Sequence, residues 1–141
     1  MKTQEPVISE YAQMWPRNVY DFKEGKKTLP SLRKALHMKP GVYVLYRDEH
    51  PYYIGKATRS LFKRIRDHAL NINDRYYNFW NHFSAFVVPN VNHIDEVEGV
   101  LIASIVITAN NSTPKIDKIR MPKEIAQRIK SHRAITEVDN L

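Results

Sequence analysis

The sequence predicts a small α/β domain, and three observations favour this class. Residues 41–46 and 52–54 are β-branched and aromatic runs on either side of a polar turn, the pattern of a β-hairpin that Gly55 ends. In residues 59–70 the hydrophobic side chains of Leu61, Phe62, Ile65 and Ala69 recur with helical spacing. Residues 77–88 are again aromatic and β-branched and predict a third strand, which Pro89 ends.

Shorter elements are expected around this centre. Residues 31–36 follow Pro30 and predict a short helix. Residues 92 to 108 or 109 predict a longer helix with Asn92 as its N-cap and Asp95 in its first turn, although residues 105–107 also suit a strand. Residues 123–132 predict a helix. We therefore expect an N-terminal extension (1–36) packing on or beside a central domain (37–117), and a basic, partly helical tail (118–141).

The composition limits the classes of partner. The 141 residues include no cysteine, which excludes disulfides and thiolate metal sites and fits a reducing cytoplasm. Lys and Arg number 22 against 15 acidic residues, a net charge of +7, which favours nucleic acid before an anionic membrane but also serves solubility. No segment approaches the roughly 20 apolar residues of a membrane span, and the first residues lack a secretory signal. We expect a cytoplasmic protein with no membrane partner.

Glu98 does not fit a purely structural role. On a helical wheel it falls inside the apolar stripe formed by Ile94, Leu101 and Ile105. A carboxylate on that face is costly unless a cation or hydrogen-bond donors meet it. The wheel leaves two interpretations open: a metal ligand or acid–base group, and a buried ion pair with Arg64 or Arg66.

A second candidate is the pair Arg64 and His68, four residues apart on one helix face beside the Leu61 and Ile65 stripe. That position suits side chains that reach into a cleft, but it also suits a solvated face. The aromatic side chains between Tyr76 and Phe86 likewise suit base stacking or, more commonly, a strand core. The remaining histidines have no metal-ligand spacing, and the four glycines form no phosphate-binding loop.

Taken together, these residues resemble the GIY-YIG nuclease superfamily over residues 40–117. Four elements stand in the order of that family. They are Gly41-Val42-Tyr43; Tyr53-Ile54-Gly55 with Lys56 and Ala57; Leu61, Arg64 and Ile65 with His68; and Glu98, Leu101 and Ile102.

The resemblance implies a central three-stranded antiparallel sheet flanked by helices, and hydrolysis of DNA phosphodiester bonds with Mg²⁺ or Mn²⁺. It implies that Glu98 binds the cation, which prefers oxygen ligands, and that Arg64 binds a phosphate oxygen. Tyr43 then orients or deprotonates the attacking water, while Tyr53 and His68 complete the hydrogen bonding around the phosphate.

The asparagine of the family motif corresponds to Asn110, with Asn111 and Asp117 as the alternatives. Arg66 is a weaker alternative to Arg64 for the arginine of the motif. We expect nucleic acid, most often DNA, to be bound by six basic residues: Lys56, Arg59, Lys63, Arg66, Lys115 and Lys118. The alternative function is a non-catalytic nucleic-acid-binding module on the same scaffold. The oligomeric state stays open.

Overall fold

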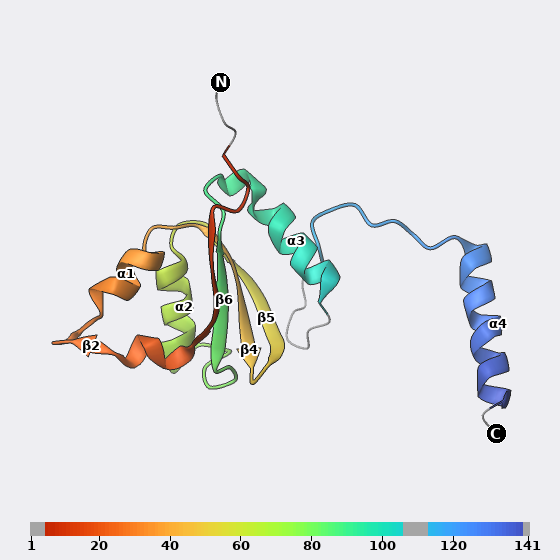
Figure 1. Ribbon diagram of the computed structural model, residues 1–141, viewed down its shortest axis with the longest axis horizontal. Coiled ribbons are helices and arrows are strands. Elements are labelled where there is room, and N and C mark those ends of the chain that lie inside the picture. The colour runs from red at the N-terminus through yellow and green to blue at the C-terminus, as the bar shows by residue number, and fades with distance from the viewer. Residues whose placement is uncertain (1–4, 106–112, 140–141) are drawn as a thin grey trace.

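The computed structural model describes residues 5–105 and 113–139 and contains a four-stranded antiparallel sheet in the order β1-β6-β4-β5. Helices lie on both faces of this sheet (Figure 1). The strands and the small hairpin are β1 (Glu10–Pro16), β2 (Lys23–Glu24), β3 (Lys27–Thr28), β4 (Gly41–Arg47), β5 (His50–Ala57) and β6 (His82–Val87). The helices are η1 (Arg17–Asp21), α1 (Pro30–Leu36), α2 (Leu61–Leu70), η2 (Val91–His93), α3 (Ile94–Ser104) and α4 (Lys123–Asp139).

The α/β class and the central hairpin are confirmed, since β4 pairs with β5 across a tight turn. The prediction that Gly55 ends the second strand is wrong. Tyr43 pairs with Gly55, and the ladder continues until Gly41 pairs with Ala57. Strand β5 also begins earlier than expected, at His50. Because β5 is the last strand of the sheet, no other strand among the described residues covers its outer edge.

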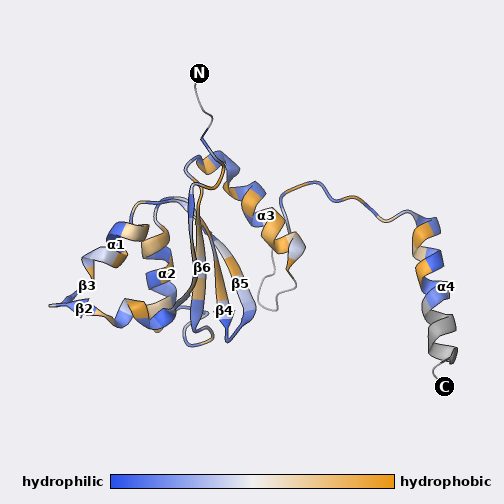
Figure 2. Cartoon of the chain, viewed as in Figure 1, coloured by the Kyte–Doolittle hydropathy of each residue, from blue (hydrophilic) through white to orange (hydrophobic). Residues whose placement is uncertain are grey.

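Two hydrophobic clusters fill the two faces of the sheet. Figure 2 shows the hydrophobic residues concentrated on the central strands and along α3. On one face, Tyr43 and Leu45 of β4 pack with Phe62 and Ile65 of α2. On the other face, residues of β4 and β5 pack against α3, among them Val42, Val44, Ile54, Ile94 and Val97. The alternation of inward side chains along β4 therefore supplies both cores.

The three-stranded sheet expected from the resemblance is wrong, because the N-terminal segment adds a fourth strand. Strand β1 pairs with β6, and its ladder is interrupted by a bulge between Ala12 and Trp15. Met14 has a φ of 52° there, and its N–H donates to the buried hydroxyl of Ser84, 3.0 Å away. A bulge leaves one backbone group out of the ladder, and here a side chain satisfies it.

Residues 17–21 join this segment to α2 by hydrogen bonds and packing. The Tyr20 side chain is fully buried, and its hydroxyl donates to the Phe62 carbonyl at 3.1 Å. Arg17 donates to the Ala69 carbonyl at 2.7 Å, at the C-terminal end of α2, where a cation is favourable. Its guanidinium also lies 5.1 Å from the ring centroid of Trp80. The N-terminal segment is thus part of the packed core.

The expected boundaries of the other elements shift. Helix α2 begins at Leu61 because the Ser60 side chain caps it, accepting from the Lys63 N–H at 3.2 Å. Asn92 is not the N-cap of α3; it lies inside η2, and Asn90 accepts its N–H. Helix α3 ends at Ser104, and Ile105 is extended, so the helix does not reach residue 108.

The third strand begins at His82 instead of residue 77. Residues 74–79 form successive turns, with Tyr77 N–H bonded to the Asp74 carbonyl and Phe79 N–H to the Tyr76 carbonyl. Asn78 has a φ of 69°, a left-handed conformation that asparagine tolerates. Aromatic composition alone predicted strand, but these residues pack their rings from a loop.

Helix α4 confirms the expected helical tail and extends it to Asp139. Figure 1 shows it apart from the sheet, and residues 115–132 are exposed. Within the described ranges, no helix has the length and apolar content needed to cross a lipid bilayer.

Candidate active site

Tyr43 lies in the middle of β4 and points toward α2, where its side chain is fully buried. Its hydroxyl lies 2.7 Å from Nε2 of His68 on α2. His68 is itself only 3% exposed, so the solvated-face alternative is wrong for this residue. Two side chains named by the sequence are therefore hydrogen-bonded to each other inside the domain.

Asp74 completes this arrangement from the turn after α2. Its Oδ1 atom lies 2.9 Å from Nδ1 of His68 and also accepts the Tyr76 backbone N–H at 2.8 Å. Asp74 was not among the predicted site residues, because a helical wheel does not extend past the end of the helix. The available signal was the turn-forming pair Asn71 and Asp74 immediately after the helix that carries His68.

Aromatic rings enclose the histidine. Tyr53 of β5 stacks on Tyr76 with 4.3 Å between ring centroids, and both rings meet His68 edge-on at 5.7 Å. Tyr76 was a candidate for base stacking, but its ring lies against Tyr53. Trp80 and Phe83 from the same aromatic run are core residues, and Phe79 remains 46% exposed.

Gly55 allows this packing. A Cβ atom on Gly55 would overlap the hydroxyl of Tyr43, and it would lie 2.5 Å from Cζ of that ring and 2.8 Å from Cε1 of Tyr53. Real Cβ atoms do not approach other heavy atoms so closely. The glycine between Ile54 and Lys56 therefore has a steric function, which is to let two phenols lie against the strand.

The electrostatics of the two phenols differ from those in water. Burial raises the pKa of Tyr43 far above its ordinary value; neighbouring Tyr53 raises it further and the Arg64 cation lowers it. Burial also raises the pKa of Tyr53, which neighbouring Tyr76 raises further. The Tyr43 phenol in turn raises the pKa of Arg64. Arg64 thus lies close enough to Tyr43 for its positive charge to favour a negative charge on the Tyr43 phenol oxygen.

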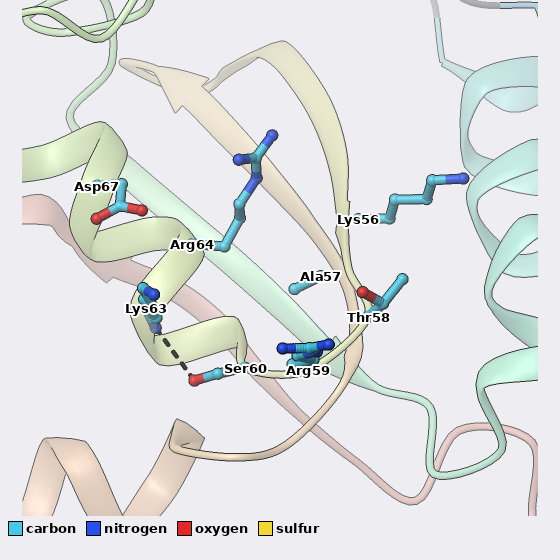
Figure 3. Close-up of a pocket in the computed structure, with 8 residues that line it drawn as sticks. All are labelled: Lys56, Ala57, Thr58, Arg59, Ser60, Lys63, Arg64 and Asp67. Atoms are coloured by element: carbon cyan, nitrogen blue, oxygen red, sulfur yellow. Dashed lines mark hydrogen bonds between the residues drawn. The ribbon is translucent and has the colours of Figure 1, made fainter.

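Arg64 belongs to a basic groove at the start of α2. The groove has a volume of about 460 Å³ and lies between the end of β5 and the first turns of the helix. Figure 3 shows Arg64 extending from α2 toward the strands and Lys56 extending from β5 toward α3. The groove is lined by Lys56, Ala57, Thr58, Arg59, Ser60, Lys63, Arg64 and Asp67. The lining thus contains four cationic side chains and one carboxylate.

Glu98 lies across the edge strand from this groove, on the face of the sheet that α3 covers. It is half-buried, and burial raises its pKa; the nearby Asp95 raises it further, while Lys56 and Lys115 lower it. In the described part of the chain no ion pair joins Glu98 to Arg64 or Arg66, so that alternative is not observed. Its charge also contributes to the raised pKa of Tyr53.

Lys56 links the groove to α3. Its Nζ atom lies 2.8 Å from Oδ1 of Asp95, and this hydrogen bond raises the pKa of Lys56 and lowers that of Asp95. Lys115 lies 3.8 Å from the same oxygen. Glu98 is thus a partly desolvated carboxylate with two cations close by.

The Glu98 carboxylate fits a hard divalent cation whose other ligands are mainly not protein groups. In residues 5–105 and 113–139 no three His, Asp or Glu side chains gather as a complete metal cage. Mg²⁺ does not need such a cage, because it commonly binds one or two carboxylates and keeps waters or phosphate oxygens as its other ligands. Glu98 offers one such carboxylate.

The remaining predicted residues are dispersed. Arg66 lies over the Phe62 ring at 5.6 Å and is absent from the groove lining. Lys118 is exposed on the tail, as is Asp117. Asn110 and Asn111 lie outside the described residues.

Comparisons of this chain with models of known protein families, with curated proteins and with solved structures find no match.

Proposed function

We propose that this chain is a divalent-metal-dependent endonuclease of GIY-YIG type that hydrolyses phosphodiester bonds of DNA. One observation supports it above the others. A buried tyrosine is hydrogen-bonded to a histidine and has a guanidinium close by, and a half-buried glutamate lies on the other side of the edge strand β5. These are the residues that the motif resemblance named independently of any structure.

The basic groove supports the proposed binding of a phosphate. Arg59, Lys63 and Arg64 project from α2 or the residues just before it, and Lys56 flanks them on β5. A guanidinium matches two phosphate oxygens with paired N–H groups, and lysines add positive charge without fixed geometry. Arg64 is the cation next to Tyr43, so the phosphate it binds would lie beside the phenol.

Tyr43 is suited to act on the attacking water. Its hydroxyl lies 2.7 Å from Nε2 of His68, and burial raises its pKa, so the phenol keeps its proton in the resting protein. A protonated phenol orients a water molecule by hydrogen bonding, and it accepts the water proton only as its own proton leaves. His68 is the neighbouring group that is able to take that proton.

Glu98 would hold the cation. When bound there, a divalent cation would polarise the phosphate and neutralise charge that develops on its oxygens. The chain's contribution is a carboxylate whose ionised form is poorly solvated, since burial raises its pKa. A cation relieves that penalty, so binding and folding are coupled at this residue.

The direct test is cleavage of supercoiled plasmid in Mg²⁺ or Mn²⁺ by the wild-type protein and by Glu98→Gln. We expect cation-dependent nicking that chelation abolishes and that falls at least about 100-fold in the variant. Glu96→Gln is the matched control, because Glu96 lies two residues earlier on α3 with a 68% exposed side chain. Equal activity of Glu98→Gln and wild type would contradict the proposal.

The second candidate is a non-catalytic nucleic-acid-binding module, which the four-cation groove favours by itself. Fluorescence anisotropy with labelled single-stranded, duplex, flap, junction and RNA substrates separates the two functions. Binding that Glu98→Gln leaves unchanged, without cleavage of any substrate by wild type, would support the module. Cleavage preferring one DNA form would support the nuclease and identify its substrate.

A further inference from the structure

The hydrogen bond between Asp74 and His68 carries an inference that rests on the proposed function and deepens it. The three groups form a continuous chain: Asp74 Oδ1 lies 2.9 Å from Nδ1 of His68, and Nε2 of His68 lies 2.7 Å from the Tyr43 hydroxyl. The His68 and Asp74 side chains are only 4% and 17% exposed. Little solvent therefore competes with these two bonds.

Hydrogen-bonding capacity decides which ring nitrogen carries the proton. A carboxylate oxygen only accepts, and Oδ1 of Asp74 already accepts from the Tyr76 N–H at 2.8 Å. Nδ1 of His68 must therefore donate to Asp74. In the neutral imidazole the other nitrogen, Nε2, is then an acceptor and faces the phenol O–H.

We propose that Asp74 is a positioning residue, which holds His68 in the tautomer that accepts the proton of Tyr43 during phosphodiester hydrolysis. Hydrogen bonds within residues 71–74 hold the turn that carries Asp74. Asp74 N–H bonds to the Asn71 carbonyl at 3.0 Å, and the Asn71 side chain accepts from the Asn73 N–H at 3.0 Å.

The proton balance of the step is complete. As the water oxygen attacks phosphorus, its proton moves to the Tyr43 oxygen while the phenol proton moves to Nε2 of His68. The bond from phosphorus to the attacking oxygen forms, and the bond to the leaving oxygen breaks. The leaving oxygen takes a proton from solvent, and the imidazolium returns its proton to solvent. Asp74 stays ionised and stabilises the imidazolium while it exists, as the aspartate does in a Ser-His-Asp triad.

Two substitutions at Asp74 separate its effects. Asp74→Ala removes the acceptor, and we expect the single-turnover rate to fall roughly 100-fold to 1,000-fold with little change in KM. Asp74→Asn keeps an oxygen that accepts from both His68 and the Tyr76 N–H, so the tautomer is retained and the rate lies between those of wild type and Asp74→Ala. Asn71→Ala is the control for loop order, because it removes a turn bond without touching His68, and it should leave the rate within about threefold.

A readout independent of activity is the pair of ring-nitrogen chemical shifts of His68, measured by ¹⁵N NMR in mildly alkaline buffer. We expect a protonated Nδ1 and a bare Nε2 in wild type and Asp74→Asn, and loss of this signature in Asp74→Ala. The double variant His68→Ala with Asp74→Ala should be no slower than His68→Ala alone, because residues that act as a unit are not additive.

Three results would overturn the inference. The first is an active wild type whose rate Asp74→Ala changes by less than about threefold. The second is a lost rate with the His68 signature unchanged, and the third is an equal loss of rate in Asn71→Ala. Either of the last two would mean that Asp74 only orders the loop. Failure of the proposed function is distinct: wild type would then cut no substrate, while the nitrogen shifts would still report whether Asp74 orients His68.

Discussion

The substitution Gly55→Ala tests the packing of the two phenols against β5 without reference to function. The added methyl carbon would overlap the Tyr43 hydroxyl and lie 2.5 Å and 2.8 Å from carbons of Tyr43 and Tyr53. Tyr43 has no room to withdraw, because its ring is fully buried and its hydroxyl is bonded to His68. The methyl group must therefore displace the ring or the strand.

The expected loss follows from two opposing effects. Overpacking a rigid, buried site costs about 1–3 kcal/mol, and two fixed rings place Gly55→Ala near the upper end. Replacing glycine by alanine reduces the entropy of the unfolded chain and returns about 0.4–1 kcal/mol. We expect a net loss of about 2 kcal/mol in the free energy of unfolding. For a chain of this size that lowers Tm by about 4–8 °C.

Gly99→Ala is the matched control in the same protein. Gly99 lies inside α3, and the atoms nearest to its added Cβ belong to Ile116, at 3.5–3.6 Å, an ordinary contact distance. Alanine is favoured over glycine in a helix interior by about 0.5–1 kcal/mol, so this variant should be more stable than wild type.

Urea unfolding followed by circular dichroism measures both variants at once. The two identical substitutions should move the unfolding midpoint in opposite directions, with the m-value unchanged. A Gly55→Ala protein within about 0.5 kcal/mol of wild type would refute the steric reasoning, and with it the placement of Tyr43 against the backbone of β5.

Four further predictions concern charged residues and their contributions to stability, cleavage and binding. Because burial raises the pKa of Glu98, ionising this carboxyl group costs stability as the pH rises past about 4.3. Glu98→Gln should therefore raise Tm at pH 7 but not at pH 4. Equal Tm values of the variant and wild type at pH 7 would contradict this. Arg64→Ala should lower the cleavage rate about 100-fold to 1,000-fold with little change in Tm, while Arg66→Ala, which loses contact with a buried ring, should leave the rate near that of wild type. With four cations in the groove, a plot of the logarithm of the binding constant for duplex DNA against the logarithm of the salt concentration should have a slope of about −3 to −4. A slope of zero would mean that the protein does not bind DNA. Arg17→Met should lower the free energy of unfolding in urea by about 1.5–3 kcal/mol, because the Arg17 guanidinium donates to the carbonyls of Ala69 and Trp80. An unchanged free energy of unfolding would mean that residues 10–21 do not stabilise the core.

Much of the fold was predictable because its signals are local. Runs of β-branched and aromatic residues on either side of a polar turn placed the hairpin, and helical spacing placed α2 and the apolar face of α3. The helical wheel also placed Glu98 on the side of α3 that meets the sheet, where it is half-buried. Element boundaries were less accurate, since they depend on single hydrogen bonds such as the Ser60 cap.

Other features depended on contacts between distant residues. Strand β1 has few strand-like signals of its own, and it is a strand because β6 offers an unpaired edge and Ser84 satisfies its bulge. The aromatic residues 77–80 were predicted as strand because β-propensity is mostly a measure of packing, and a loop that packs its rings has the same composition.

The sequence by itself determined which chemical groups are available and their order along the chain: two tyrosines, an arginine and histidine four residues apart, and a glutamate on an apolar helix face. Tertiary structure alone decided which of them touch. His68 turned out to be buried between Tyr43 and Asp74, and Glu98 to lie beside Lys56 instead of an arginine. The physical reason is that spacing orients side chains within one element, whereas hydrogen bonds and pKa values depend on neighbours that only the folded chain brings within a few ångströms.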